Sequence, residues 1–121
     1  MRVTQVVFNP TQLTIVPPGT VTLRVLVAGI MEQGDSGRKV NVQLFDSDFL
    51  NPDDFLDSKT TTLPTNLAVG DLVRLTFRFV LSCVNGEIRG AAGGSGQSEA
   101  ELIITFGPTG ETFAGAKAIC G

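Results

Sequence analysis

Alternation of apolar and polar side chains is the feature that most constrains the fold of this chain. Residues 72–84 place an apolar side chain at every second position, with mostly polar residues between them. Residues 20–28 repeat the pattern, with valine and leucine alternating with threonine and arginine. A period of two with one apolar face predicts half-buried antiparallel strands.

Shorter runs of the same kind occupy much of the remaining chain, at residues 3–8, 12–16, 38–45, 59–63, 87–91, 99–106 and 111–120. Proline and glycine separate them, and Asn85-Gly86 has the composition of a two-residue hairpin turn. Many short strands with turn signals predict an all-β fold, an antiparallel β-sandwich of seven to nine strands. The length predicts a single domain over residues 1–121.

Composition argues against several functions. The chain has no His, Trp or Tyr, so it lacks His-based acid–base chemistry and His metal ligands. Its net charge of −3 argues against a nucleic-acid partner, because phosphate binding needs clustered Lys and Arg. No apolar run is long enough to span a membrane, and the first residues do not resemble a signal peptide. We therefore expect a non-enzymatic protein, and the compartment stays open.

Five aspartates follow the strand at 38–45 and form the strongest candidate site: Asp46, Asp48, Asp53, Asp54 and Asp57. Asp46 and Asp48 are two positions apart, so both would project from one face of extended chain. Calcium takes six to eight hard oxygen ligands and tolerates irregular loops. The sequence therefore gives these five residues as candidate calcium ligands.

Two family resemblances bear on this site. Residues 8–27 resemble the opening of bacterial immunoglobulin-like domains, with an edge strand, a proline–glycine turn and a long second strand. The pattern Asp46-x-Asp48 with Asp54 after a five-residue spacer, preceded by Val-x-Leu-Phe and followed by Phe-Leu, resembles the third calcium loop of C-two domains. That resemblance implies a calcium-dependent binding module. Asp57 stands where the family has glycine, no lysine-rich strand offers a lipid site, and only Asp35 is present to complete the ligands.

A structural interpretation of the same loop stays open beside calcium. Asn51-Pro52-Asp53-Asp54 has the residue types of a helix start, with an Asn cap, Pro at the first position and acids near the positive end of the helix dipole. On this interpretation the aspartates cap a short helical turn and keep the loop soluble.

The two cysteines leave a second alternative open. Cys83 and Cys120 both fall on inward positions, which permits a disulfide. If Asn85-Gly86 starts a four-strand meander, however, the two cysteines would lie at opposite ends of the sandwich. The disulfide and the meander then exclude each other, because a disulfide needs Cα atoms about 4.4–6.8 Å apart.

Outward positions carry both charges and apolar side chains. The charged ones, Arg24, Arg74, Arg78, Glu99 and Glu101, predict cross-strand ion pairs on a solvated face. The apolar ones, Leu26, Val80, Val84, Ile103 and Ile119, indicate contact with another layer or subunit, or else cover of part of this face by the loops of the chain itself. Residues 90–98, rich in glycine, are expected to form a mobile loop.

Together these features predict a structural or protein-interaction domain of the decoration, adhesion or filament type, which associates with a protein partner or with itself. The alternative function is a C-two-like calcium-dependent binding module. Membrane binding is not favoured, although the alternative would allow it.

Overall fold

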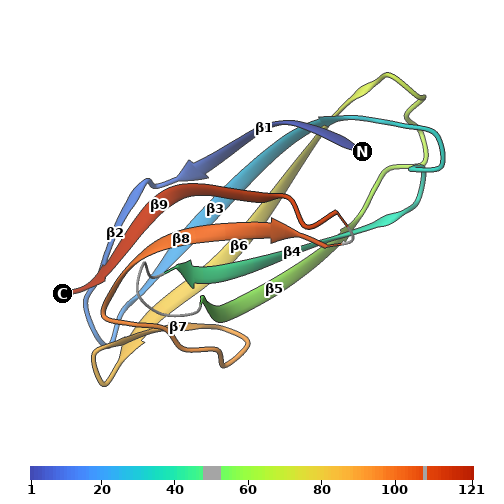
Figure 1. Ribbon diagram of the computed structural model, residues 1–121. Coiled ribbons are helices and arrows are strands. Elements are labelled where there is room, and N and C mark those ends of the chain that lie inside the picture. The colour runs from blue at the N-terminus through green and yellow to red at the C-terminus, as the bar shows by residue number, and fades with distance from the viewer. Residues whose placement is uncertain (48–52, 108) are drawn as a thin grey trace.

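The computed structural model describes residues 1–47, 53–107 and 109–121, and within them the chain forms nine strands and no helix (Figure 1). The strands are β1 (Arg2–Asn9), β2 (Gln12–Ile15), β3 (Thr20–Ile30), β4 (Lys39–Ser47), β5 (Asp54–Thr62), β6 (Leu72–Val84), β7 (Glu87–Gly90), β8 (Glu99–Phe106) and β9 (Thr112–Cys120). The predicted all-β fold class is confirmed. No helix that could span a membrane occurs in the described part of the chain.

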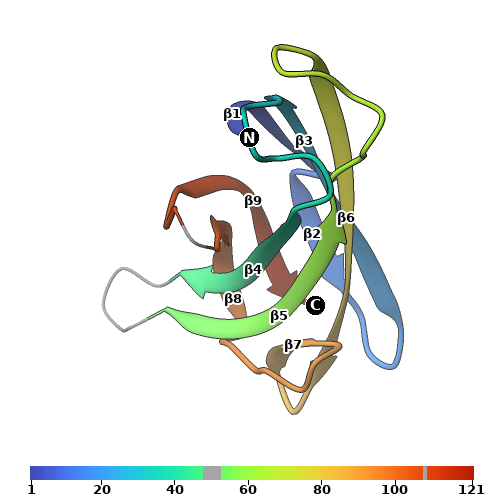
Figure 2. The same cartoon turned by 90° about the vertical axis from the view of Figure 1, so that its right-hand side faces the viewer.

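The strands form two curled sheets that face each other, as the end-on view in Figure 2 shows. The four-stranded sheet has the order β1-β3-β6-β7, and the five-stranded sheet has the order β2-β9-β8-β4-β5. The first extended segment serves both sheets: β1 pairs antiparallel with β3, and after Pro10 β2 pairs with β9. The β2–β9 pairing is parallel, so the five-stranded sheet is mixed rather than purely antiparallel.

The core lies between the sheets and follows the alternation in the sequence. On β3 and β6 the inward side chains are buried or partly buried, and several are fully enclosed: Leu23, Val25, Phe79 and Leu81. Their partners from the other sheet include Val42, Leu44, Leu102 and Ile104. Burying each such side chain contributes about 1.5–3 kcal/mol, so this two-sided core is the main source of stability.

The predicted hairpin between β6 and β7 is confirmed. Asn85 and Gly86 have φ angles of 54° and 75°, the positive values that a type I′ turn requires at both positions. The chain then turns a second time within the glycine-rich segment. Hydrogen bonds join the Gly96 N–H to the Ile88 carbonyl and the Ile88 N–H to the Gln97 carbonyl, so residues 95–97 run back beside β7.

This second reversal explains why the two cysteines meet. Cys83 on β6 and Cys120 on β9 form a disulfide with Cα atoms 5.8 Å apart, linking the two sheets. The argument that a β6–β7 hairpin excludes the bridge was wrong, because it allowed only one reversal before β8. With two reversals, β8 starts at the end of the sandwich where β6 finishes, and β9 returns to that end.

Strand β5 begins at Asp54, five residues earlier than the sequence pattern predicts. Asp54 pairs with Asp46 and Phe55 with Phe45 across the β4–β5 ladder. The helical interpretation of this stretch was therefore wrong at Asp54, which belongs to a strand; Asn51 and Pro52 lie outside the described residues. Pairing with β4 and burial of Leu56 outweigh the local helix-start signal.

Candidate functional site

Among the five candidate calcium ligands, Asp46 is completely buried, and its Oδ2 accepts a hydrogen bond of 2.6 Å from the Gln97 N–H. A Cβ atom at Gly96 would overlap this carboxylate, so the glycine-rich segment lies directly against it. Side chains at Gly90 and Gly94 would likewise overlap the backbone of β5. Glycine at these positions permits close packing of backbone on backbone, and the mobility expected of this segment stays a prediction.

The other candidate ligands have different surroundings. Asp57 is buried, and its Oδ1 accepts a hydrogen bond from the Ser58 N–H, while its Oδ2 has no hydrogen-bond partner among the described residues. Asp54 is partly buried opposite Asp46, and Asp53 is exposed. Asp48 lies outside the described residues. In the part of the chain that the structure describes, no three acidic, Cys or His side chains are grouped as a metal site.

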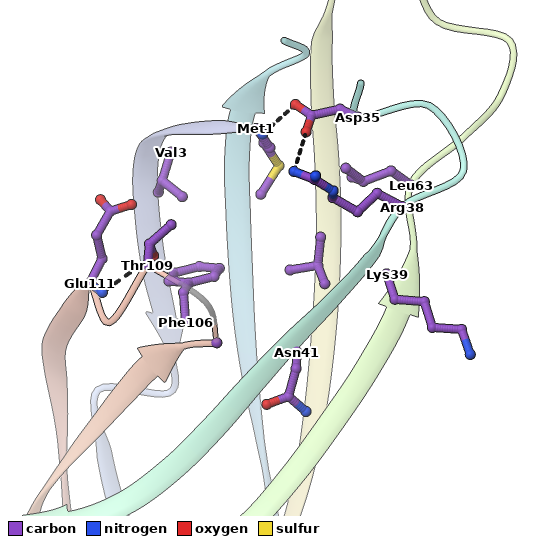
Figure 3. Close-up of a pocket in the computed structure, with 12 residues that line it drawn as sticks. Met1, Val3, Asp35, Arg38, Lys39, Asn41, Leu63, Phe106, Thr109 and Glu111 are labelled. Atoms are coloured by element: carbon purple, nitrogen blue, oxygen red, sulfur yellow. Dashed lines mark hydrogen bonds and ion pairs between the residues drawn. The ribbon is translucent and has the colours of Figure 1, made fainter. Parts of the chain in front are cut away.

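Asp35, considered above as a further ligand, lies elsewhere, beside a small cavity shown in Figure 3. The Met1 amino group and the Glu32 N–H both bind its Oδ2, and Arg38 Nη1 lies 3.7 Å from its Oδ1. Burial by itself raises the pKa of Asp35, but these hydrogen bonds and positive charges outweigh it and hold the pKa below the usual value. Asp35 is thus an ion-paired structural group and is not joined to Asp46.

The cavity beside Asp35 has a volume of about 80 Å³ and apolar walls that include Val3, Leu63 and Phe106. Pockets that bind small molecules usually measure about 300–1,000 Å³. This cavity is therefore much smaller than an ordinary substrate pocket. Three of its polar groups bind one another, since Met1 and Arg38 both contact Asp35, as the dashed lines in Figure 3 show.

The outer face of the four-stranded sheet combines exposed apolar side chains with arginine. Val7 and Leu26 are direct cross-strand partners, 43% and 42% exposed, beside a hollow of about 240 Å³. Arg24 and Arg78 are also direct partners, in the next outward row. Neither of these arginines forms an ion pair with any described residue. We call this surface the arginine face; it is defined by Val7, Leu26, Val80, Arg24, Arg74 and Arg78.

The outer face of the five-stranded sheet carries apolar side chains and carboxylates. Phe55, Phe45, Ile103 and Ala114 are successive cross-strand partners, and the two phenylalanine rings touch edge to face at 5.9 Å. Glu101 lies in the next outward row on β8. We call this surface the acidic face; it is defined by Phe45, Phe55, Ile103, Ala114, Glu99 and Glu101.

The expected ion pairs between outward arginines and glutamates were wrong. Arg24, Arg74 and Arg78 belong to strands of one sheet, whereas Glu99 and Glu101 belong to β8 of the other. Because both sets of side chains point outward, the core separates them. No ion pair joins the two sets among the described residues.

Comparison with known proteins identifies no family. No protein-family model and no curated protein matches the chain. Among solved structures, it is similar to a β-glucosidase from Listeria innocua in complex with gluconolactone, with 13% sequence identity and a TM-score of 0.44. The match covers 98% of this chain and spans only 15% of that chain. A similarity this low supports no inference about activity.

Two features of the outer faces were not found from the sequence. Phe55 meets Phe45 only because β5 starts early, and the helical interpretation of residues 51–54 concealed that pairing. Ile103, one of the apolar residues assigned to the outer face, is buried within the chain itself, where its cross-strand partners are Phe45 and Ala114. Its place in an unbroken run of apolar residues at 102–104 was the available signal.

Proposed function

We propose that this chain is a non-enzymatic structural or protein-interaction domain that docks through the outer face of its four-stranded sheet. The observation that carries the proposal is the row of exposed Val7 and Leu26 beside the directly opposed Arg24 and Arg78. Like charges placed directly opposite each other destabilise a sheet, and exposed apolar side chains gain free energy when covered. The opposed arginines cost stability in an isolated domain, and a partner that covers the apolar row and brings carboxylates to the arginines would lower the free energy at both places.

Two further observations favour binding over catalysis. The chain contains no His, and the cavity beside Asp35 is small, with the buried Asp35 carboxylate already bound by the Met1 amino group. By contrast, the outer face of a sheet offers an extended surface built on hydrogen-bonded strands, which suits the docking of another protein surface. A decoration, adhesion or filament subunit needs this kind of surface and no reactive group.

Sedimentation of the purified protein over a concentration series tests the proposal. We expect concentration-dependent association that is lost when Val7→Ser and Leu26→Ser are combined. Both side chains are already more than two-fifths exposed, so the double variant should stay folded. Thr4→Ser, an exposed change on the same strand, is the matched control and should associate normally. A protein that stays monomeric throughout, unaffected by the serine pair, would contradict docking through this face by self-association.

We propose calcium binding at the aspartate stretch as a second candidate function. The observation that favours it is the placement of two carboxylates, Asp46 and Asp54, directly opposite each other on β4 and β5, with the buried Asp57 nearby on β5. A cation would offset the repulsion between them. Since no three described carboxylates are grouped, the ion would need further oxygens, of which Asp48 is the candidate from the sequence.

Calorimetric titration with calcium tests this second candidate. Binding in the micromolar to millimolar range should disappear in Asp54→Asn with Asp48→Asn, whereas Asp71→Asn, on a distant turn, should bind normally. Absence of heat and of any calcium-dependent rise in melting temperature would eliminate calcium and leave the docking proposal intact.

A further inference from the structure

The arginine face and the acidic face lie on opposite outer surfaces of one molecule, so their charges are unable to meet within a chain. We propose that they meet between chains: the arginine face of one copy stacks on the acidic face of the next. This inference rests on the proposed docking function and names both the partner, a second copy of this chain, and the second surface. Charge complementarity between the two faces is the observation that selects this partner.

The two faces match row by row. On the arginine face, the row Val7–Leu26–Thr76 lies next to the row Asn9–Arg24–Arg78. On the acidic face, the row Phe55–Phe45–Ile103–Ala114 lies next to the row Ser47–Glu101–Lys117. Outward rows on a strand are about 7 Å apart in any sheet, because they are two residues apart. Stacking the apolar rows therefore brings the arginine row over the Glu101 row.

The acidic face is also hollowed beside its carboxylates. Glu101 lines a hollow of about 310 Å³ together with Gln12 and Lys117, and Glu99 lines an adjoining one of about 240 Å³. Neither glutamate forms an ion pair with any described residue. A guanidinium group is planar and binds a carboxylate through two N–H donors, so arginine from a neighbouring copy suits these hollows.

Lys117 is the positive charge beside Glu101 that opposes this contact. It is the cross-strand partner of Glu101 on β9 and points the same way. The Lys117 charge weakens the negative potential that Glu99 and Glu101 present to an arginine of the neighbouring copy. The two copies therefore associate more weakly than they would without Lys117. Lys117→Glu should therefore strengthen stacking.

A contact between two different faces does not close on itself, so a stacked pair still has one free arginine face, on one copy, and one free acidic face, on the other. The expected assembly is an open row of copies that lengthens with concentration. A symmetric dimer through the arginine face alone is disfavoured, because it would place arginine rows against each other.

A charge exchange tests the proposal. In one variant, Arg24→Glu is combined with Arg78→Glu; in the other, Glu99→Lys is combined with Glu101→Lys. Each variant alone presents the same charge on both faces, so each should associate at least about tenfold more weakly than the unchanged protein. Mixed in equal amounts they should associate again, because every contact then joins opposite charges. Recovery in the mixture also shows that both variants are folded.

Sedimentation of the two variants, their mixture and Lys117→Glu separates the outcomes. The proposal requires recovery in the mixture, stronger association of Lys117→Glu, and weakening as salt rises from about 0.05 M to about 0.5 M. If the unchanged protein associates and the serine pair Val7→Ser with Leu26→Ser abolishes association, but the mixture does not recover, docking survives and stacking of opposite faces is refuted. If either charge variant unfolds, Arg24→Gln with Arg78→Gln replaces it and must weaken association.

Discussion

At the scale of single residues, Gly94 illustrates how close the glycine-rich segment lies to strand β5. A Cβ atom there would overlap the Phe55 carbonyl oxygen and crowd the Leu56 Cα atom, both of which are backbone. Gly94→Ala should therefore cost about 2 kcal/mol or more of unfolding free energy, because the backbone of one segment must move. Denaturant unfolding measures this cost. Ala92→Ser, exposed in the same segment, is the control and should change stability by less than about 0.5 kcal/mol.

Asp35 gives a prediction with a definite dependence on pH. Its pKa is lower in the folded protein than in the unfolded chain, so its contribution to stability is present above the unfolded pKa and is lost as the pH falls through the folded value. Asp35→Asn should cost about 1–3 kcal/mol near pH 7, because the Met1 amino group loses its charged partner.

The same comparison repeated near pH 3 should show a smaller difference between Asp35→Asn and the unchanged protein. Asp53→Asn, exposed and without a described ion pair, is the matched control and should behave like the unchanged protein at both pH values. A cost of Asp35→Asn that is independent of pH would show that the charge of Asp35 contributes nothing.

At the scale of elements, the disulfide fixes the end of β6 to the end of β9. It closes a loop with a sequence separation of 37, which contributes about 3–4 kcal/mol on the chain-entropy model. Cys83→Ala with Cys120→Ala should lose about this amount in denaturant unfolding, and reduction of the unchanged protein should cause a similar loss. Rapid alkylation of both thiols in the native protein without a reductant would contradict the bridge.

Most elements could be predicted from the sequence because their burial pattern is local. The alternation on β3 and β6 specifies both the strand and its inward face. The start of β5 could not be predicted, since Asn-Pro-Asp-Asp favours a helix and only pairing with β4, distant in sequence, decides otherwise. The disulfide depended on a reversal made by glycine residues whose close packing has no periodic signal.

In the candidate site too, the features set by local alternation could be predicted, and those set by long-range pairing could not. The inward position of Asp46 continues the alternation of Val42 and Leu44, whereas the burial of Asp57 follows a register shift in the β4–β5 pairing that the sequence does not display. The outward apolar positions Leu26, Val80, Val84 and Ile119 were predicted from alternation and are exposed. Alternation does not show to which sheet an outward residue belongs. For this reason Arg24 and Glu101 were expected to form an ion pair within the chain.

At the scale of the whole molecule, the arginine face and the acidic face are the surfaces through which the proposed association takes place. The core holds two outer faces apart, one with arginine and one with carboxylate, and each carries an apolar row beside its charged row. Under the proposed stacking, copies can assemble into an open row, since every copy carries both an arginine face and an acidic face. The small cavity near Asp35 takes no part in the proposed contact.

The most direct test of the central claim is a set of methyl NMR spectra recorded from dilute to concentrated protein. The account predicts that concentration-dependent shifts gather on the outward methyl groups of Val7, Leu26 and Val80 and on Ile103 of the opposite face. Core methyl groups such as those of Leu23 should not shift. Shifts confined to residues that line the cavity near Asp35, or no shifts at any concentration, would contradict association through the two outer faces.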